Sequence, residues 1–412
     1  MSQTTPVSVD QLKVGHYVVL PFGWRNHPFL FSSFRIKDEE QLQILRDLGV
    51  RAIPVDLTKS VVIEEEPAPT EAEELLVEPE ITIANQHKAK QQAARRSIRQ
   101  AERSYTNALS PLRESLTRLN LKPDEGLATV AELVRNAAVS LAEQEGSVGF
   151  HLVRSIRNSD PLLLHSLNVA FIAMLIAREA GWDPLAIKDA GLAGLVHDIG
   201  ELRIPTQVTR KRTELTKAEV NFLKLHVQYG FEQLTQLKAY TPEVRQATLQ
   251  HHECLDGSGY PSGLKDGEIA PLSRLIAVVD YYEEQLHPRN GLGTAHPNQV
   301  IASLYKKANK QFDSQFTQLL IKVLGVYPPG SVVTLSDGTL ALVMSSEPSA
   351  PLKPMVLPYE KGRVQEGVDL IALQNDERTI SGIVAHEELT PQQQEFFGIT
   401  RHACYYFSLP HE

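Results

Sequence analysis

Five histidines and two aspartates of this 412-residue chain lie at the ends or on the faces of apolar stretches. They come in five separate blocks, in the order His165, His197-Asp198, His226, His251-His252 and Asp280. Each block alone is weak evidence, because a lone histidine on an apolar helix is more often a core residue than a ligand. Together they would bury several polar groups, which is unfavourable unless a partner satisfies them. A metal cluster would be such a partner.

Imidazole and carboxylate side chains are the ligands expected for Fe, Mn, Ni or Zn. An aspartate can bridge two such ions about 4 Å apart, and paired ions can activate a water molecule and neutralise a phosphodiester in one step. The local positive charge of metal ions would also suit an anionic substrate, which the formal net charge of −9 would otherwise disfavour.

The segment DGSGYP, residues 256–261, contains two glycines and a proline. These residues predict a sharp loop whose backbone can approach a ligand closely. The alternative is a tight turn with no role in binding.

Helical periodicity dominates residues 125–325. In the stretch HSLNVAFIAMLIAREAGW the apolar residues repeat at intervals of three and four, and Gly181 follows as a stop. The residues that carry this repeat are Leu167, Ala170, Phe171, Met174 and Leu175. The pattern predicts a helical bundle, so the chain is expected to be mainly α.

The flanking regions predict two small modules and a connector. Residues 1–62 combine alternating apolar stretches at 16–20 and 52–55 with a helix-like DEEQLQILRDLG, which is typical of an α+β domain. Residues 63–84 are acidic and contain prolines, which favours a linker. Residues 85–124, rich in Ala, Gln and Arg, predict connecting helices that could also dimerise. Their basic run is interpreted as a solvated helix face rather than a binding site for nucleic acid or membrane.

After Tyr327 the pattern changes to β structure. Asp337-Gly338 lies between two strand-like runs, a strong hairpin signal, and further apolar runs follow at 355–357, 368–373 and 383–385. Residues 326–412 are therefore expected to form a small β-rich extension. The fragment 125–325 is expected to fold and bind metal by itself, because it contains all the candidate ligands.

Composition excludes several classes of protein. A net charge of −9 argues against wrapping long nucleic acid. Cys254 and Cys404 are too few for a disulfide framework, which suits a reducing compartment. The N-terminus lacks the pattern of a signal peptide, and no stretch reaches the roughly 18 apolar residues of a membrane span. We expect a cytoplasmic protein without membrane insertion.

The order of the histidine and aspartate blocks, together with the motif DGSGYP, resembles the HD-GYP branch of the HD phosphohydrolase superfamily. The resemblance covers roughly residues 145–325. Supporting landmarks are Ile204-Pro205, Leu215-Thr216, Gly263-Leu264, Arg274 and Gln311-Phe312-Asp313. The N-terminal segment resembles a domain of unknown function that commonly precedes HD-GYP domains.

This resemblance implies an all-helical catalytic domain that hydrolyses cyclic di-GMP to pGpG or GMP at a centre of two or three metal ions. It implies that His197 and Asp198 are catalytic and that Asp198 bridges the metals. The implied metal ligands are His165, His197, Asp198, His226, His251, His252 and Asp280. The implied substrate-binding residues are Lys211, Asp256, Gly257, Gly259, Tyr260, Pro261, Arg274 and Arg289. The loop 256–261 would also be a contact surface for protein partners.

Three positions depart from the family pattern. Glu201 replaces a lysine of the HDIGK motif that is thought to contact the scissile phosphate. Pro161 stands where three-metal members carry a glutamate, which favours two ions over three. Fe or Mn is the expected metal, with Ni or Zn as the alternatives. After Asp280 the chain keeps Arg289 but has Leu292 in place of a second basic residue.

Two hypotheses for the function follow. The intact ligand set favours a working phosphodiesterase that acts on cyclic di-GMP. The alternative is a weak or inactive homologue that binds metal or nucleotide and acts as a sensor or protein-interaction module. Glu201 is the main argument for this alternative, because a carboxylate near the phosphate should repel the substrate.

Overall fold

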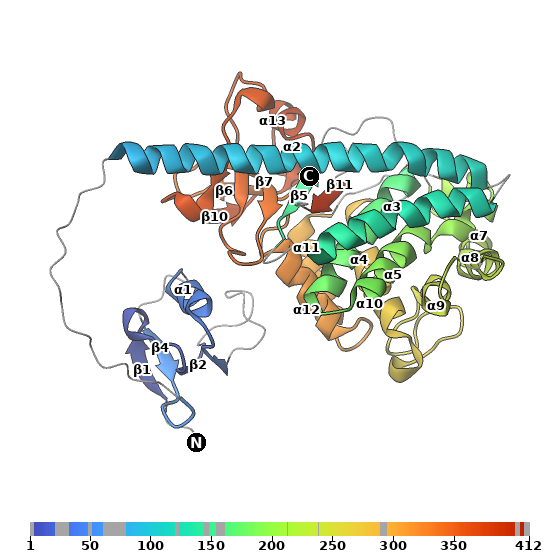
Figure 1. Cartoon of the computed structure of the whole chain (residues 1–412), viewed down its shortest axis with the longest axis horizontal. Coiled ribbons are helices and arrows are strands. Elements are labelled where there is room, and N and C mark those ends of the chain that lie inside the picture. The colour runs from blue at the N-terminus through green and yellow to red at the C-terminus, as the bar shows by residue number, and fades with distance from the viewer. Residues whose placement is uncertain are drawn as a thin grey trace. The chain divides into compact units, whose positions relative to one another are not determined.

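The structure of the chain is a computed structural model that describes residues 4–20, 33–47, 52–60, 80–119, 123–143, 148–153, 161–211, 213–237, 239–288, 295–399 and 404–407. It divides into two compact units, residues 1–88 and 89–412 (Figure 1).

The first unit is built on a four-stranded antiparallel sheet with the strand order β1-β4-β2-β3. Its elements are β1 (Thr5–Ser8), the 3-10 helix η1 (Val9–Gln11), β2 (Tyr17–Val19), β3 (Ser33–Arg35), α1 (Glu39–Asp47) and β4 (Ala52–Val55). Val18, Leu45, Ile53 and Val55 form its small core. The predicted α+β module is confirmed. Residues 63–79 of the predicted linker, 63–84, lie outside the described residues. Its last residues, 80–84, belong to α2, so the predicted end of the linker is wrong there.

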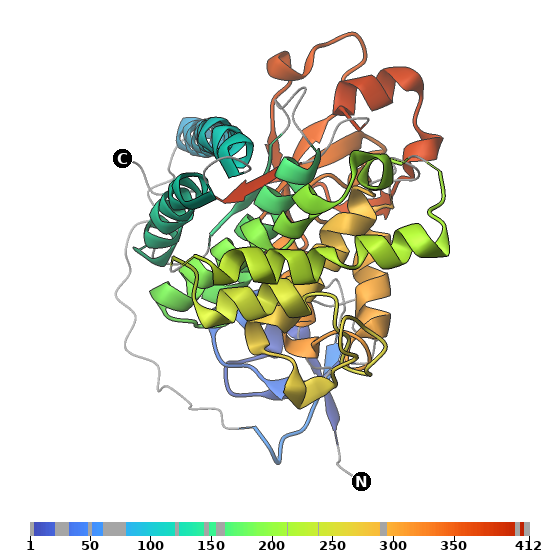
Figure 2. The same cartoon turned by 90° about the vertical axis from the view of Figure 1, so that its right-hand side faces the viewer.

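Helix α2 (Glu80–Leu119) is a single helix of 40 residues, followed by α3 (Pro123–Glu143). Ile98, Ala101, Tyr105, Ala108 and Leu112 are buried along α2 at helical spacing. This apolar face belongs to the core of the second unit. The predicted connecting helices are therefore also core elements, and α2 and α3 lie side by side in Figure 2.

The candidate site residues come from the helical bundle of the second unit, which faces the viewer in Figure 2. Its α-helices are α4 (Pro161–Glu179), α5 (Pro184–Val196), α6 (Thr206–Thr209), α7 (Lys217–Leu223), α8 (His226–Thr235), α9 (Pro242–Gln250), α10 (Pro271–Leu286), α11 (Pro297–Lys307) and α12 (Ser314–Leu324). Two 3-10 helices, η3 (Ile199–Arg203) and η4 (Asp266–Glu268), connect them. The helical prediction for this region is confirmed.

Helix α4 is the centre of the bundle. All residues from Leu163 to Ala177 are buried, and Gly181, with φ +75°, lies just past its end. By length and composition, α4 is the one helix among the described residues that could cross a membrane, but most of it is buried inside the protein. Helices α5 and α9 begin with the N-caps Asp183 and Thr241, whose side chains accept hydrogen bonds from the first turn.

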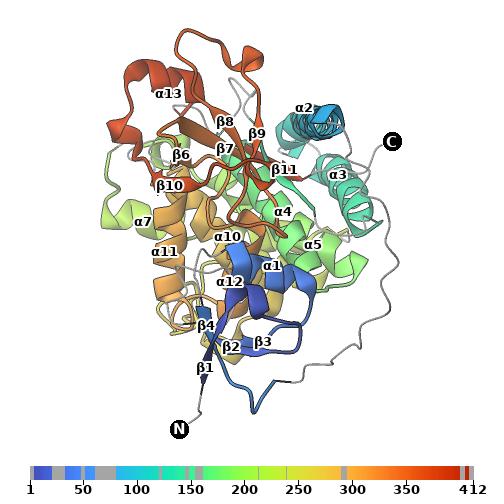
Figure 3. The same cartoon turned by 90° about the vertical axis from the view of Figure 1, so that its left-hand side faces the viewer.

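A seven-stranded antiparallel sheet packs beside the bundle (Figure 3). Its strands are β5 (Phe150–Val153), β6 (Val332–Leu335), β7 (Leu340–Ser346), β8 (Met355–Pro358), β9 (Ile371–Ala372), β10 (Ile380–Ile383) and β11 (Cys404–Phe407). The remaining elements are α13 (Pro391–Phe397) and the 3-10 helices η5 (Gln365–Gly367), η6 (Leu373–Asn375) and η7 (His386–Glu388). The predicted hairpin is confirmed, with Gly338 at φ +84° between β6 and β7.

The predicted boundary at residue 325 differs from the structure. Strand β5 lies within the segment 125–325, yet it pairs with β7 and β11 of the C-terminal region. The ring of Phe171 on α4 contacts Tyr105 of α2 and Tyr406 and Phe407 of β11. The predicted β-rich C-terminal region is confirmed, but one hydrophobic core runs from α2 through the bundle to β11 and includes part of the C-terminal sheet. Other residues of that sheet, among them Val333, Val343 and Val356, form a separate small core.

This shared core predicts how fragments behave. The fragment 125–325 lacks α2 and β11 and exposes side chains such as Phe171, each worth roughly 1.5–3 kcal/mol of burial. Because whole domains are stable by only about 5–15 kcal/mol, this fragment should be insoluble or should melt without a cooperative transition. The fragment 89–412 should melt cooperatively in circular dichroism. A cooperative transition of the shorter fragment at the same temperature would contradict the shared core.

Candidate metal centre

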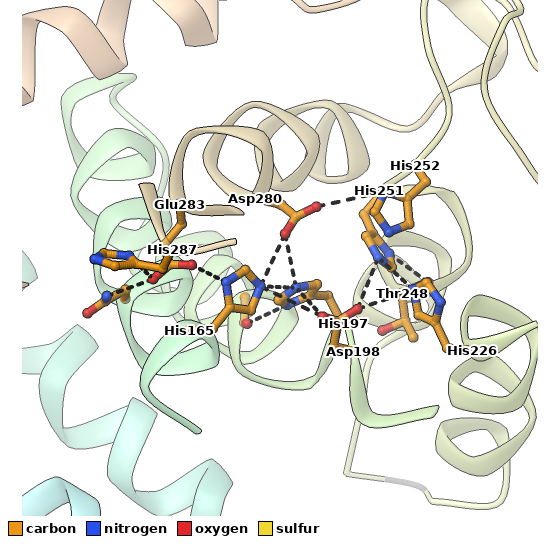
Figure 4. Close-up of polar contacts among 12 residues, drawn as sticks. His165, His197, Asp198, His226, Thr248, His251, His252, Asp280, Glu283 and His287 are labelled. Atoms are coloured by element: carbon orange, nitrogen blue, oxygen red, sulfur yellow. Dashed lines mark hydrogen bonds and ion pairs between the residues drawn. The ribbon is translucent and has the colours of Figure 1, made fainter. Parts of the chain in front are cut away.

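All five sequence blocks converge in the second unit, as Figure 4 shows. His165 lies on α4, His197 and Asp198 join α5 to η3, His226 begins α8, His251 and His252 follow α9, and Asp280 lies on α10. Six of these side chains are buried and His252 is half-buried. The donor atoms of two subsets, His165, His197 and Asp280, and Asp198, His226, His251 and His252, lie within 4.8 Å of one another in each subset.

Asp198 lies between two pairs of imidazoles. Its Oδ2 is 3.7 Å from Nε2 of His165 and 3.4 Å from Nε2 of His197. Its Oδ1 is 3.2 Å from Nε2 of His226 and 3.6 Å from Nε2 of His251. Each carboxylate oxygen thus faces a different pair.

Asp280 also reaches both sides of the cluster. Its Oδ1 is 3.1 Å from Nε2 of His165 and 3.5 Å from Nε2 of His197. Its Oδ2 is 3.8 Å from Nδ1 of His252. Two buried carboxylates therefore lie among five imidazoles.

Backbone carbonyls orient three of the rings. The Nδ1 atoms of His197, His226 and His251 lie 2.7, 2.8 and 2.9 Å from the carbonyl oxygens of Gly194, Leu223 and Thr248, each three residues earlier. Because a carbonyl oxygen only accepts, Nδ1 must carry the proton, and in the neutral ring Nε2 presents a lone pair to the cluster.

The Nε2 atoms also face each other. They are 3.1 Å apart in His165 and His197 and 3.3 Å apart in His226 and His251. Two lone pairs at this distance repel unless a proton or a cation lies between them. The arrangement therefore fits a divalent metal ion, for which imidazole and carboxylate are suitable ligands.

The pKa values of the cluster residues also show that a positive charge among the buried carboxylates is stabilising. Burial opposes protonation of His197, but the neighbouring Asp198 and Asp280 carboxylates outweigh it and raise its pKa to about 9. Burial lowers the pKa values of His251 and His252, which keeps these rings neutral. Burial would raise the pKa of Asp280, but contacts with His165 and His197 hold it well below its usual range.

Two glycines allow the ligand-bearing elements to meet. A Cβ on Gly200 would lie 2.0 Å from the carbonyl oxygen of His226, so only glycine lets η3 approach the start of α8. A Cβ on Gly194 would lie 2.6 Å from Cα of Ala170, which explains the close packing of α5 on α4. These two approaches bring Asp198 to His226 and His197 to His165.

The predicted loop 256–261 lies against the cluster. The ring of Tyr260 stacks on His252 with centroids 4.7 Å apart, and Nζ of Lys224 lies 4.8 Å from the Tyr260 ring centre. Asp256 accepts a hydrogen bond from the Ser258 N–H at 2.9 Å. Gly257 has φ +79°, a Cβ on Gly259 would meet the Cys254 nitrogen at 2.4 Å, and Pro261 follows Tyr260.

The other predicted substrate-binding residues have acidic partners. Lys211 pairs with Glu219 at 2.7 Å. Arg274 lies 3.1 Å from Asp266 and 3.5 Å from Asp313 and also donates to two backbone carbonyls. Arg289 and Leu292 lie outside the described residues. Among the described residues of the predicted set, Tyr260 is the one whose ring stacks on a histidine of the cluster.

The sequence interpretation missed four residues around the cluster: Asn168, Lys224, Glu283 and His287. Glu283 contacts Nδ1 of His165, and Asn168 and His287 in turn bond to Glu283. Asn168 follows His165 by three positions, and Glu283 follows Asp280 by three positions. A polar residue on an apolar helix, one turn from a ligand, is the signal that could have identified both.

Comparisons with known proteins agree with this geometry. Residues 150–316 match the family model described as HD domain. This segment is an HD domain. Residues 4–129 match a domain of unknown function, DUF3391, so both resemblances predicted from the sequence are confirmed.

Relatives of the HD domain include named phosphodiesterases. A cyclic di-GMP phosphodiesterase of Pseudomonas aeruginosa is 28% identical over 87% of this chain and 85% of its own length. A cyclic di-GMP phosphodiesterase response regulator of Xanthomonas campestris is 32% identical over 37% of this chain and 41% of its own. A 3'3'-cGAMP-specific phosphodiesterase of Vibrio cholerae is 31% identical over 38% of this chain and 37% of its own.

The contact at Gly200 predicts a strong effect of a single methyl group. Gly200→Ala should reduce the free energy of unfolding by more than the roughly 1–3 kcal/mol of a typical overpacked site, because the clash is with backbone. The control is Gly267→Ala, where a Cβ meets nothing within 4 Å. Urea unfolding measures both. Equal stability of the two variants would contradict the close approach of η3 and α8.

Proposed function

We propose that this protein is a metal-dependent phosphodiesterase that hydrolyses cyclic di-GMP to pGpG, GMP or both. The observation that carries the proposal is the position of Asp198, whose two oxygens face two separate pairs of imidazoles. This is the arrangement needed to share one carboxylate between two metal ions. The relatives named as cyclic di-GMP phosphodiesterases support the choice of substrate.

In this proposal seven side chains would hold two ions of Fe or Mn, and Asp198 would be the ligand shared between them. The ligands are His165, His197, Asp198, His226, His251, His252 and Asp280. When bound, the ions supply Lewis acidity and activate a water molecule at neutral pH. The protein contributes oriented rings and buried carboxylates, so little reorganisation is needed when charge develops in the transition state. His197 and Asp198 lie at the centre of this arrangement.

The substrate is proposed to bind against Tyr260 and the loop 256–261. A nucleobase can stack on an exposed part of an aromatic ring, and Lys224 beside that ring offers a positive charge to a phosphate. Arg289 remains a predicted phosphate contact. Lys211 and Arg274 are proposed to support the site without contacting the substrate, because each already pairs with a carboxylate, Glu219 and Asp266 respectively.

The remaining predictions concern context. Cys254 and Cys404 are not joined in a disulfide, which supports a reducing, cytoplasmic compartment. A homodimer and protein partners at the loop 256–261 stay predictions.

The proposal is tested by turnover of purified protein reconstituted with Mn²⁺ or Fe²⁺. Cyclic di-GMP should be consumed, with pGpG or GMP as the product, and 3'3'-cGAMP serves as the competing substrate. Preferred hydrolysis of 3'3'-cGAMP would change the substrate. Full metal loading without turnover of either nucleotide would favour the alternative function, a metal-binding sensor or interaction module.

Metal content is the second measurement. Wild-type protein should bind about two transition-metal ions per chain, because seven ligands with one bridging carboxylate fill two sites. Asp198→Ala should release metal. The control is Asp189→Ala, which removes a buried aspartate that bonds Thr241 instead. Elemental analysis that finds no stoichiometric metal in reconstituted wild-type protein would overturn the site assignment.

Glu201 is predicted to be a brake on catalysis. It is three residues after Asp198 and only 6% exposed, so its charge is poorly screened by solvent. Glu201→Lys should raise turnover of cyclic di-GMP by about ten- to a hundred-fold, equivalent to roughly 1.4–2.7 kcal/mol in the transition state. Glu201→Gln, which only removes the charge, should give a smaller increase.

The metal content of both Glu201 variants should match that of the wild type. Equal turnover of wild type, Glu201→Lys and Glu201→Gln at equal metal loading would rule out the brake and leave the phosphodiesterase proposal intact.

A further inference from the structure

A chain of buried polar contacts leads away from His165. Glu283, fully buried on α10, contacts Nδ1 of His165 with its Oε2. Its Oε1 is 2.9 Å from Nδ2 of Asn168 and 2.9 Å from Nδ1 of His287. A carboxylate only accepts hydrogen bonds when ionised, so all three partners donate to Glu283. Nδ1 of His165 therefore carries its proton, and Nε2 faces Asp198 and Asp280.

Asn168 connects this carboxylate to two elements outside the bundle. Its side-chain Oδ1 accepts a hydrogen bond from the backbone N–H of Tyr405 on β11 at 3.1 Å. The same oxygen accepts from the Tyr105 hydroxyl on α2 at 3.4 Å. A flipped amide would place its NH₂ group against the Tyr405 N–H and its oxygen against the Glu283 carboxylate, so these two contacts permit one orientation. Asn168, Tyr105 and Tyr405 are all fully buried.

We propose that Asn168 and Glu283 are positioning residues that tie the geometry of His165 to β11 and α2. This inference deepens the proposed function, since it rests on His165 being a metal ligand. Strand β11 supplies a backbone donor, the Tyr405 N–H, which lies 237 residues along the chain from Asn168. The C-terminal strand thereby becomes part of the metal-positioning apparatus of the HD domain.

The energetics favour a role in metal binding over a role in packing alone. A carboxylate behind a histidine ligand fixes its tautomer and direction, and loss of such a partner typically weakens metal affinity by about 10–100-fold. The effect should be confined to the ion held by His165. An ion held by His226, His251 and His252 would depend less on Glu283, because backbone carbonyls orient two of those rings.

The test compares Asn168→Ala and Glu283→Gln with Asn298→Ala. Asn298 is a matched control, since its side chain also bonds a backbone carbonyl, that of Val326, and a hydroxyl, that of Ser331, within the same unit. Full-length proteins are titrated with Mn²⁺ against a chromophoric chelator, and melting temperature, kcat and KM are measured in parallel. Tyr105→Phe, which keeps the ring packed on Phe171, is the mildest variant.

We expect Asn168→Ala and Glu283→Gln to bind one of two Mn²⁺ ions about 10–100-fold more weakly and to keep the affinity of the other. With saturating substrate, kcat should fall at low metal and recover at high metal, while KM changes little. Tyr105→Phe should weaken the same ion by a smaller factor, and Asn298→Ala should leave both affinities at wild-type values.

Unchanged affinity for both ions in Asn168→Ala and Glu283→Gln would overturn the inference. So would equal weakening of both ions together with a lower melting temperature, which is the result of a purely structural role. The proposed function can fail independently of this inference. A wild-type protein that binds two ions but hydrolyses no cyclic dinucleotide would contradict the proposed function, and the metal affinities of the variants would still test the inference.

Discussion

The structure depends on burying two carboxylates among five imidazoles at the centre of a helical bundle. Burying charged groups is unfavourable unless they are paired, and here the partners come from several helices and helix ends. The helices α4, α5, α8, α9 and α10 must therefore meet within a few ångströms. Gly194 and Gly200 make this possible, because a methyl group at either position would collide with the backbone of the neighbouring element.

Orientation of the ligands is built into the backbone as well as the side chains. Three histidines donate from Nδ1 to the carbonyl three residues earlier, so the end of a helix or turn sets the direction of the ring. His165 lies inside α4, where the backbone carbonyls are already bonded, and it uses Glu283 instead. This difference explains why one ligand depends on a polar network that reaches β11 and α2.

The protein is acidic overall, yet its proposed substrate is an anion. The positive charge must therefore be local. In the proposed function it would come from metal ions held by the histidine and aspartate cluster and from Lys224 beside Tyr260. Glu201 is buried on η3. Its predicted effect is to oppose this positive charge and to slow the proposed hydrolysis.

The sequence by itself identified the seven histidines and aspartates that lie together in the structure, the helical bundle and the hairpin at Gly338, because these depend on residue type, helical period and local turn chemistry. It predicted Asp198 as the bridge only through the family resemblance. Tertiary structure alone decided that β5 pairs with β11 and that α2 completes the core, since strands carry no local mark of a distant partner. It also decided the contact between Asn168 and Glu283, because a buried hydrogen bond between residues 115 positions apart leaves no periodic pattern in the sequence.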